Sequence, residues 1–273
     1  MRVRRGESST RGENGEFVEA LARGLDVLTT FGPTAMELTV SEVAARTGLA
    51  RPTARRLLMT LEQLGYLRST DGVYSLTTRV LEIGTSVIAA QGIWEIARPH
   101  LVALVARTGE SSSMSQLDGS DIVYTARVPV AKIIALSVSI GTRFPAVATS
   151  MGRVLLADLS HKQLDEALAT PSRSNVIPKV TPARRELDRT LAEVRQRGWA
   201  LSDEQLSVGI RSVAAPVRDH DGRAVAAMNV TVHAAETSID HLTTVYLPLL
   251  LDAAAAVTEE WSNLAMLPVA QTS

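Results

Sequence analysis

The stretch from Leu38 to Tyr74 constrains the fold of this chain most strongly, because it has the pattern of two short helices joined by a glycine turn. The first helix is predicted to begin at Thr39 or Ser41 and to end at Gly48, since glycine takes the left-handed cap without steric cost. Pro52 suits the first turn of a second helix, whose apolar residues recur every three or four positions. This arrangement is the form of a helix-turn-helix.

The polar residues of the second helix gather at its N-terminal end, which in a helix-turn-helix enters the major groove first. Arginine can bind a phosphate or bridge O6 and N7 of guanine, and threonine can contact a phosphate or a thymine methyl. From Arg46 to Arg68 there are five arginines and one acid, a net charge of +4. The predicted DNA-binding residues are Arg51, Thr53, Arg55, Arg56, Thr60 and Arg68.

Asp71-Gly72 lies between two alternating runs, which predicts a hairpin. A hairpin at this place would be the wing of a winged helix and would contact the DNA backbone. The alternative for the whole stretch is an ordinary helical hairpin with a solvated basic face. The glycine turn, the basic helix end and the hairpin together favour DNA binding.

The composition separates this basic stretch from a larger remainder. The chain has 273 residues, 45% of them hydrophobic, and a net charge of −1, so two domains with buried cores are expected. Residues 1–80 hold eleven basic and nine acidic residues and the rest seventeen and twenty, so DNA binding would depend on a local patch. The absence of cysteine excludes disulfides and thiolate metal sites and fits a cytoplasmic protein.

Two further patterns argue against export or a membrane span. The first fifteen residues are polar and charged, unlike a signal peptide. The longest apolar run, from Leu242 to Val257, is interrupted by Pro248 and Asp252 and is too short to cross a bilayer.

The periodicity of the apolar residues predicts the domain order. We expect a disordered tail at 1–15, a winged helix-turn-helix domain at 16–76, a linker helix at 77–92, an α/β domain at 93–265 and a tail at 266–273. The helix from Arg79 to Gln91 is apolar along one side, so it should pack on a second copy, on its own chain, or on both. One winged helix covers few base pairs, which also favours a dimer.

The larger domain alternates predicted helices with pairs of strands, which indicates the α+β class with helices packed on a central antiparallel sheet. Residues 141–145 are expected as a loop, Ser150 as a helix N-cap, and Pro248 as a bend in the last helix. The predicted strands are 111–116, 122–128, 132–140, 199–202, 210–218 and 224–232. The predicted helices are 94–107, 151–159, 161–169, one from Thr181-Pro182 to Gly198, and 239–264, besides 17–31 in the first domain.

These elements resemble the IclR (isocitrate lyase regulator) family of bacterial transcription factors over roughly residues 16–265. The resemblance is carried by Leu38–Leu67, Val80–Gly84, Phe144–Ala157 and Gly209–Val217. It implies an N-terminal winged helix, a C-terminal GAF-like domain that binds a small effector, often an organic acid, and assembly as a dimer or dimer of dimers. Operator DNA is then the main partner, and RNA polymerase is a candidate partner.

Three segments are most similar to the subgroup that controls aromatic-acid catabolism through protocatechuate and the β-ketoadipate pathway. They are Ile122–Pro129, Ala148–Arg153 and Ala226–Val230. The resemblance therefore implies an effector such as protocatechuate, 4-hydroxybenzoate or β-ketoadipate. A regulator of a different carboxylic-acid operon is the alternative.

The resemblance also implies where the effector lies. Family members offer backbone N–H groups at a helix N-terminus, here at Ser150 and Met151, and such a terminus attracts anions. The other positions that match the family pocket are Ser202, Asp203, Ser212, Asn229 and Thr231. Arg127 or Arg143 could pair with a carboxylate. The plain alternative for the serines, the threonine and the asparagine is a solvated strand face.

The sequence gives no sign of an enzyme, a metal site or a cofactor. No nucleophile elbow, P-loop or dinucleotide motif occurs. The five histidines show no ligand spacing, although Asp203 with His220 or His233 stays open as a pair. We therefore expect no catalytic residues. The competing functions are an enzyme fused to a DNA-binding module and an architectural DNA-binding protein without a sensor.

Overall fold

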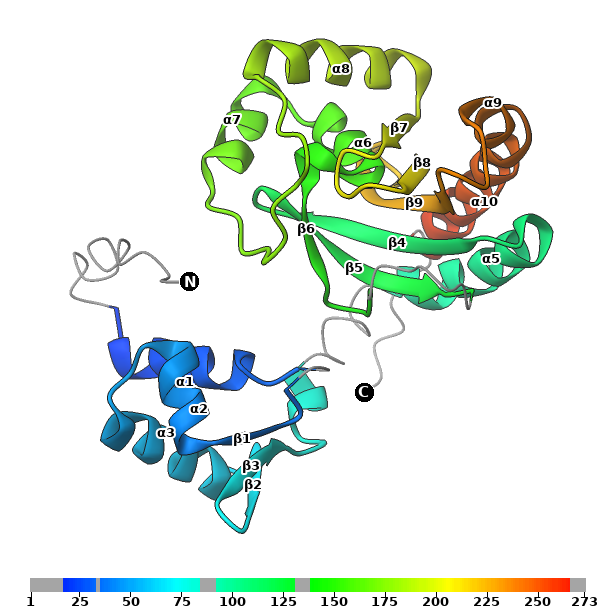
Figure 1. Ribbon diagram of the computed structural model, residues 1–273. Coiled ribbons are helices and arrows are strands. Elements are labelled where there is room, and N and C mark those ends of the chain that lie inside the picture. The colour runs from blue at the N-terminus through cyan, green and yellow to red at the C-terminus, as the bar shows by residue number, and fades with distance from the viewer. Residues whose placement is uncertain (1–16, 33–34, 84–91, 131–137, 266–273) are drawn as a thin grey trace. The chain divides into compact units, whose positions relative to one another are not determined.

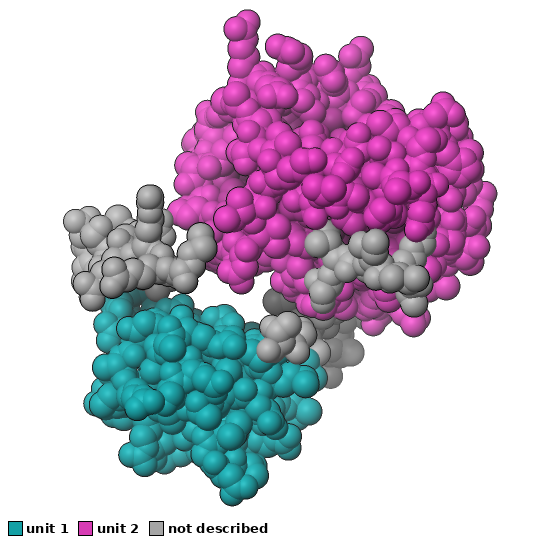
Figure 2. Space-filling model, viewed as in Figure 1, with its two compact units in different colours: residues 1–90 teal, residues 91–273 magenta. Residues whose placement is uncertain are grey.

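The computed structural model describes residues 17–32, 35–83, 92–130 and 138–265. It divides into two compact units, Met1–Ala90 and Gln91–Ser273, which Figure 2 colours separately. Both predicted tails, residues 84–91 of the predicted linker helix and residues 132–137 of a predicted strand lie outside the described residues. The domain boundaries drawn from the sequence remain predictions.

The first unit contains the predicted pair of helices and the hairpin, together with a strand that the sequence analysis missed (Figure 1). Its core is formed by Val27, Val43, Ala54 and Leu58, each fully buried. The elements are α1 (Glu19–Thr29), β1 (Glu37–Thr39), α2 (Val40–Thr47), α3 (Arg51–Gln63), β2 (Leu67–Thr70) and β3 (Val73–Leu76). The additional strand β1 pairs with β3, so the wing is part of a three-stranded sheet.

The turns of this unit follow from local sequence. Thr39 caps α2 in a capping box with Glu42, whose pKa is lowered because its carboxylate accepts hydrogen bonds from the backbone N–H and hydroxyl of Thr39. Gly48 ends α2 at φ 69°. Asp71 and Gly72 both have positive φ, as a type I′ hairpin turn requires. These features confirm the predicted helix-turn-helix and wing.

The second unit is built on a six-stranded antiparallel sheet with the strand order β6-β5-β4-β9-β8-β7 (Figure 1). The strands are β4 (Ser111–Asp118), β5 (Asp121–Val128), β6 (Arg143–Pro145), β7 (Ala200–Asp203), β8 (Ile210–Arg218) and β9 (Ala224–His233). The helices are α5 (Ile93–Thr108), η1 (Ala146–Ala148), α6 (Ser150–Asp158), α7 (His161–Ala169), α8 (Arg184–Arg197), α9 (Ile239–His241), η2 (Leu242–Tyr246) and α10 (Leu247–Ala265). The predicted α+β class is confirmed.

Helices cover both faces of this sheet. Helices α5 and α10 pack on one face, where Met114, Val213 and Met228 are fully buried. Helix α6 packs on the other face and itself packs against α8, above Tyr124, Ala214 and Ala227. Because side chains alternate along a strand, every second residue of β8 and β9 faces α6. That face is the one that carries the polar strand residues.

The C-terminal helical run, Ile239–Asn263, is long and apolar enough to cross a membrane by length and composition alone. Packing accounts for the apolar residues on one side of this run, since Leu242, Leu250 and Val257 are fully buried in the core against the sheet. A π-helical turn at Leu242–Tyr246 ends two residues before Pro248. Proline has no N–H for the preceding turn and its ring crowds the carbonyl four residues back, so the wider turn accommodates it.

Several predicted boundaries were wrong. Residues 143–145 form the edge strand β6 rather than a loop, and Pro145 is tolerated there because an edge strand needs fewer hydrogen bonds. Val138 to Ile140 are not in a strand. Thr149, not Ser150, is the N-cap of α6, and its Oγ1 accepts the N–H of Gly152 at 3.0 Å. Helix α8 begins at Arg184, later than expected.

Gly152 is required where α6 crosses the η1 turn. A Cβ on Gly152 would lie 2.2 Å from the carbonyl oxygen of Ala146, closer than any real contact. We expect Gly152→Ala to lower the unfolding free energy of this unit by about 1–3 kcal/mol, as overpacked cores do. The measurement is calorimetric unfolding of the full chain.

The matched control is Gly24→Ala in α1, where a Cβ would meet nothing within 4 Å. It should stabilise the first unit by about 0.5–1 kcal/mol, because alanine is the better helix former. Equal effects of the two substitutions would contradict the close packing of α6 on η1.

Candidate functional site

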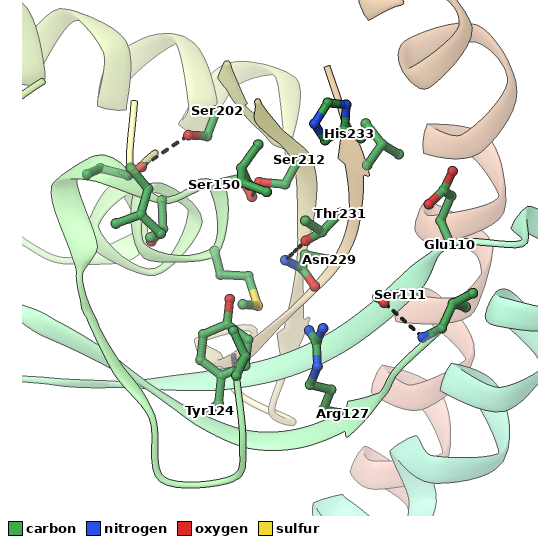
Figure 3. Close-up of a pocket in the computed structure, with 18 residues that line it drawn as sticks. Glu110, Ser111, Tyr124, Arg127, Ser150, Ser202, Ser212, Asn229, Thr231 and His233 are labelled. Atoms are coloured by element: carbon green, nitrogen blue, oxygen red, sulfur yellow. Dashed lines mark hydrogen bonds between the residues drawn. The ribbon is translucent and has the colours of Figure 1, made fainter. Parts of the chain in front are cut away.

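A cavity lies between α6 and the facing side of the sheet in the second unit (Figure 3). Its empty volume is about 790 Å³, a figure that includes space open to solvent. Apolar walls come from residues such as Val138, Leu206 and Val232. The polar residues that line it are Glu110, Ser111, Tyr124, Arg127, Thr149, Ser150, Ser202, Ser212, Asn229, Thr231 and His233.

The first turn of α6 forms one wall of the cavity. Thr149 caps the N–H of Gly152, whereas the N–H groups of Ser150 and Met151 have no carbonyl acceptor within the helix. The Ser150 hydroxyl lies 2.7 Å from that of Ser212 on β8, and both point into the cavity (Figure 3). The helix start therefore offers free N–H groups and a hydroxyl pair to a ligand.

Asn229 and Thr231 reach the same cavity from β9 because two residues along a strand return to the same face. Asn229 Nδ2 donates to Thr231 Oγ1 at 2.9 Å, and Asn229 Oδ1 accepts the N–H of Ser113 at 3.0 Å. Asn229 thus ties two strands together as well as lining the cavity. The Thr231 hydroxyl lines the cavity and accepts the hydrogen bond from Asn229.

Ser202 lies at the side of the cavity next to β7, where it supports the helix start. Its Oγ donates to the carbonyl of Ala148 at 3.0 Å. Buried Arg153 makes a similar connection, since its Nε donates to the Val147 carbonyl at 3.0 Å and its guanidinium reaches the Leu201 carbonyl. Burial lowers the pKa of Arg153 to about 10, so it stays charged at neutral pH. These two side chains hold η1 against β7.

The structure separates the two arginines that the sequence left as alternatives. Arg127 lines the cavity, and its guanidinium donates to Ser113 Oγ at 3.1 Å. Arg143 does not line the cavity, and its guanidinium binds Asp118 instead. This hydrogen bond is the main reason that the pKa of Asp118 is lowered. Asp203 also lies outside the lining and pairs with Arg211 at 2.7 Å.

Five polar residues that line the cavity were not among the predicted ligand contacts: Glu110, Ser111, Tyr124, Thr149 and His233. Tyr124 points its hydroxyl into the cavity from β5 (Figure 3) and packs edge-on against Phe144. Burial raises its pKa to about 12, so the hydroxyl is protonated at neutral pH. Within the described ranges, no cluster of three histidine, aspartate or glutamate side chains could hold a metal.

The first unit presents a separate basic surface at the start of α3. Arg55 and Arg56 are exposed, and neither has an ion pair or side-chain hydrogen bond within the described part of the chain. Arg51 binds the Ser41 hydroxyl, and Arg68 on the wing binds that of Ser75. Thr53 is half-buried, and the Thr60 hydroxyl donates to its own helix at the Arg56 carbonyl.

The side chain of Glu62 on α3 is hydrogen-bonded to the wing. The carboxylate of Glu62 accepts both the N–H of Ser69, at 3.1 Å, and its hydroxyl, at 2.7 Å. The wing and the basic start of α3 are thereby held in one unit. This geometry suits contact with a groove through α3 and with the backbone through the wing.

Known proteins are similar to this chain in both of its units. The family model for the IclR helix-turn-helix domain matches residues 20–71, and that for the bacterial transcriptional regulator IclR C-terminal domain matches residues 85–259. The chain is 35% identical to the Pca regulon regulatory protein of Pseudomonas putida, over 87% of this chain and 82% of that protein. It is 33% identical to the p-hydroxybenzoate hydroxylase transcriptional activator of Acinetobacter baylyi, over 88% and 90% of the two chains.

A solved structure shows the same fold. The crystal structure of a transcriptional regulator from Rhodococcus sp. RHA1 superposes with a TM-score of 0.77 and 42% identity, covering 91% of this chain and all of that one. These relatives are named as regulators and not as enzymes. With a helix-turn-helix model matched in the first unit and an effector-domain model matched across the second, the chain belongs to the IclR family of bacterial transcriptional regulators.

Proposed function

We propose that this chain is a DNA-binding transcriptional regulator of aromatic-acid catabolism, controlled by a small carboxylic acid and acting in the cytoplasm. The observation that supports it most directly is the cavity beside α6, which joins free helix N–H groups to hydroxyl, amide and guanidinium side chains. The relatives whose names refer to the Pca regulon and to p-hydroxybenzoate hydroxylase support the compound class. The proposed effectors are 4-hydroxybenzoate, protocatechuate and β-ketoadipate.

The test of the effector is calorimetric titration of the full chain with these three acids. Thr231→Val removes a lining hydroxyl and should weaken binding of the best acid by about 2- to 12-fold, the range of one hydrogen bond. Thr190→Val, at a half-buried position of α8 that does not line the cavity, is the control and should leave the affinity unchanged. Failure of all three acids to bind would remove the compound class and leave the DNA-binding assignment standing.

DNA recognition is proposed for Arg51, Thr53, Arg55, Arg56 and Thr60 on α3, with Arg68 on the wing. Arg55→Ala and Arg56→Ala should each weaken operator binding by about 1–3 kcal/mol if the side chain reads a base. The measurement is operator affinity at fixed salt. Arg185→Ala, an exposed arginine of α8, is the control. If neither α3 variant changes the affinity, the groove assignment is wrong.

A dimer is proposed because two symmetric half-sites give a selective operator. Leu81 and Ile83, at the described start of the linker, are 63% and 53% exposed and would meet a second copy. We expect Ile83→Asp to weaken the dimer, measured by sedimentation at micromolar concentration. Ile177→Asp is the matched control, because Ile177 is 92% exposed in the second unit. A wild-type monomer with full operator affinity would contradict the proposal.

A further inference from the structure

A β-bulge in β5 decides which side chains share the cavity. Met114 pairs with Ala126 and Ser115 pairs with Tyr124, so Thr125 is an extra residue without a partner of its own on β4. Without the bulge, Tyr124 and Arg127 would lie on opposite faces of the sheet, since they are three residues apart. The bulge turns both toward α6, a use of bulges that is frequent beside functional sites.

Arg127 has unused binding capacity in this position. It is partly buried, and burial lowers its pKa, which means that its charge is poorly solvated. Among the described residues, it donates one hydrogen bond, to Ser113 Oγ, and makes no ion pair. A guanidinium has five N–H donors in a fork that matches a carboxylate. A ligand carboxylate would therefore satisfy groups that the protein itself leaves open.

Tyr124 adds a neutral donor beside this cation. The residue is 7% exposed, and its hydroxyl makes no hydrogen bond to the described residues. The hydroxyl points into the cavity and is therefore open to a ligand there. Because it remains protonated at neutral pH, it can donate to a carboxylate but does not repel one.

The opposite wall of the cavity has a different character. Figure 3 shows Ser150 and Ser212 on the far side of the cavity from Tyr124 and Arg127. The start of α6 carries only the partial charge of a helix end, roughly half an elementary charge. Its hydroxyl pair can both donate to and accept from a neutral hydroxyl. Glu110 also lines the cavity and adds a carboxylate to the lining that holds the guanidinium of Arg127. The selectivity of the cavity for an anion must therefore come from local contacts and not from the net charge of its lining.

We propose that Arg127 and Tyr124 bind the effector carboxylate, and that Ser150 at the start of α6 and Ser212 on β8 bind a hydroxyl on the opposite side of the aromatic ring. The ligand class is then an aromatic monocarboxylate with a para hydroxyl. This inference rests on the proposed function. It reverses the orientation expected from the family resemblance, in which the carboxylate lies at the N–H groups of Ser150 and Met151.

The test is calorimetry on the full chain with 4-hydroxybenzoate, its amide 4-hydroxybenzamide, and benzoate. The wild type should bind the acid more tightly than the amide. Arg127→Gln should weaken binding of the acid by about 10- to 100-fold, the range for a hydrogen bond to a charged group, and leave the amide within about threefold. The acid and the amide should then bind almost equally. Arg143→Gln is the matched control and should keep the wild-type preference, because Arg143 lies outside the cavity.

A second comparison tests the roles of the two cavity walls separately. The double variant Ser150→Ala with Ser212→Ala should remove the preference for 4-hydroxybenzoate over benzoate while keeping the preference for acid over amide. Tyr124→Phe should weaken binding of 4-hydroxybenzoate by about 2- to 12-fold, the range of one hydrogen bond. Thermal unfolding of each variant shows whether it is folded. If Arg127→Gln does not fold, Tyr124→Phe and the serine variant still test the orientation.

The outcomes are distinct. If Arg127→Gln keeps the full wild-type preference for acid over amide, or if Tyr124→Phe binds the acid as tightly as the wild type, the proposed orientation is overturned. Loss of that preference in the serine variant would overturn it as well. If none of the three compounds binds the wild type, the proposed effector class fails first, and that result is separate from a wrong orientation.

Discussion

The second unit depends on one constraint, which is that its sheet is buried on both faces. A strand covered by helices on both sides must place each side chain in one of two different environments. Met114, Val213 and Met228 fill the side under α5 and α10, where only packing matters. Ser212, Asn229 and Thr231 fill the other side, where α6 leaves a cavity that accepts polar groups. The same alternation therefore builds both the core and the candidate pocket.

The close approach of α6 depends on a few contacts around η1. Gly152 allows the helix to cross the Ala146 carbonyl, which no larger residue could do without a shift. Arg153 and Ser202 then connect the η1 carbonyls to β7. The buried guanidinium of Arg153 donates to backbone carbonyl oxygens and not to a carboxylate. It thereby connects the backbone of η1 to the backbone of β7. The start of α6 is thereby fixed over the cavity, and a fixed site costs a ligand less ordering free energy.

Much of this fold could be predicted because its signals are local. Gly48, Pro52 and Asp71-Gly72 specify their turns through backbone preferences, and the spacing of apolar residues specifies α2, α3 and most strands. The residues of the candidate site were harder to predict from the sequence. Thr149 and Ser150 are adjacent hydroxyl residues, and either could have been the cap. Arg127 and Arg143 were equivalent in the sequence, and only the tertiary contact of Arg143 with Asp118 distinguishes them.

Tyr124 shows the limit of pattern reasoning most clearly. Strict alternation places it on the opposite face from Arg127, and the bulge at Thr125 that unites them depends on pairing with β4, far from any local signal. β1 was missed for a similar reason, since three residues carry too little pattern to predict a strand. Long-range pairing, rather than residue type, decided these positions.

The central claim is that an acid in the cavity changes DNA binding, which requires that the acid prefer one arrangement of the protein over another. The direct measurement is operator affinity with and without saturating 4-hydroxybenzoate, together with the affinity for the acid with and without operator. Both affinities should change by the same factor, about 5- to 150-fold for a typical allosteric regulator. Tight binding of the acid with no change in operator affinity would contradict the account.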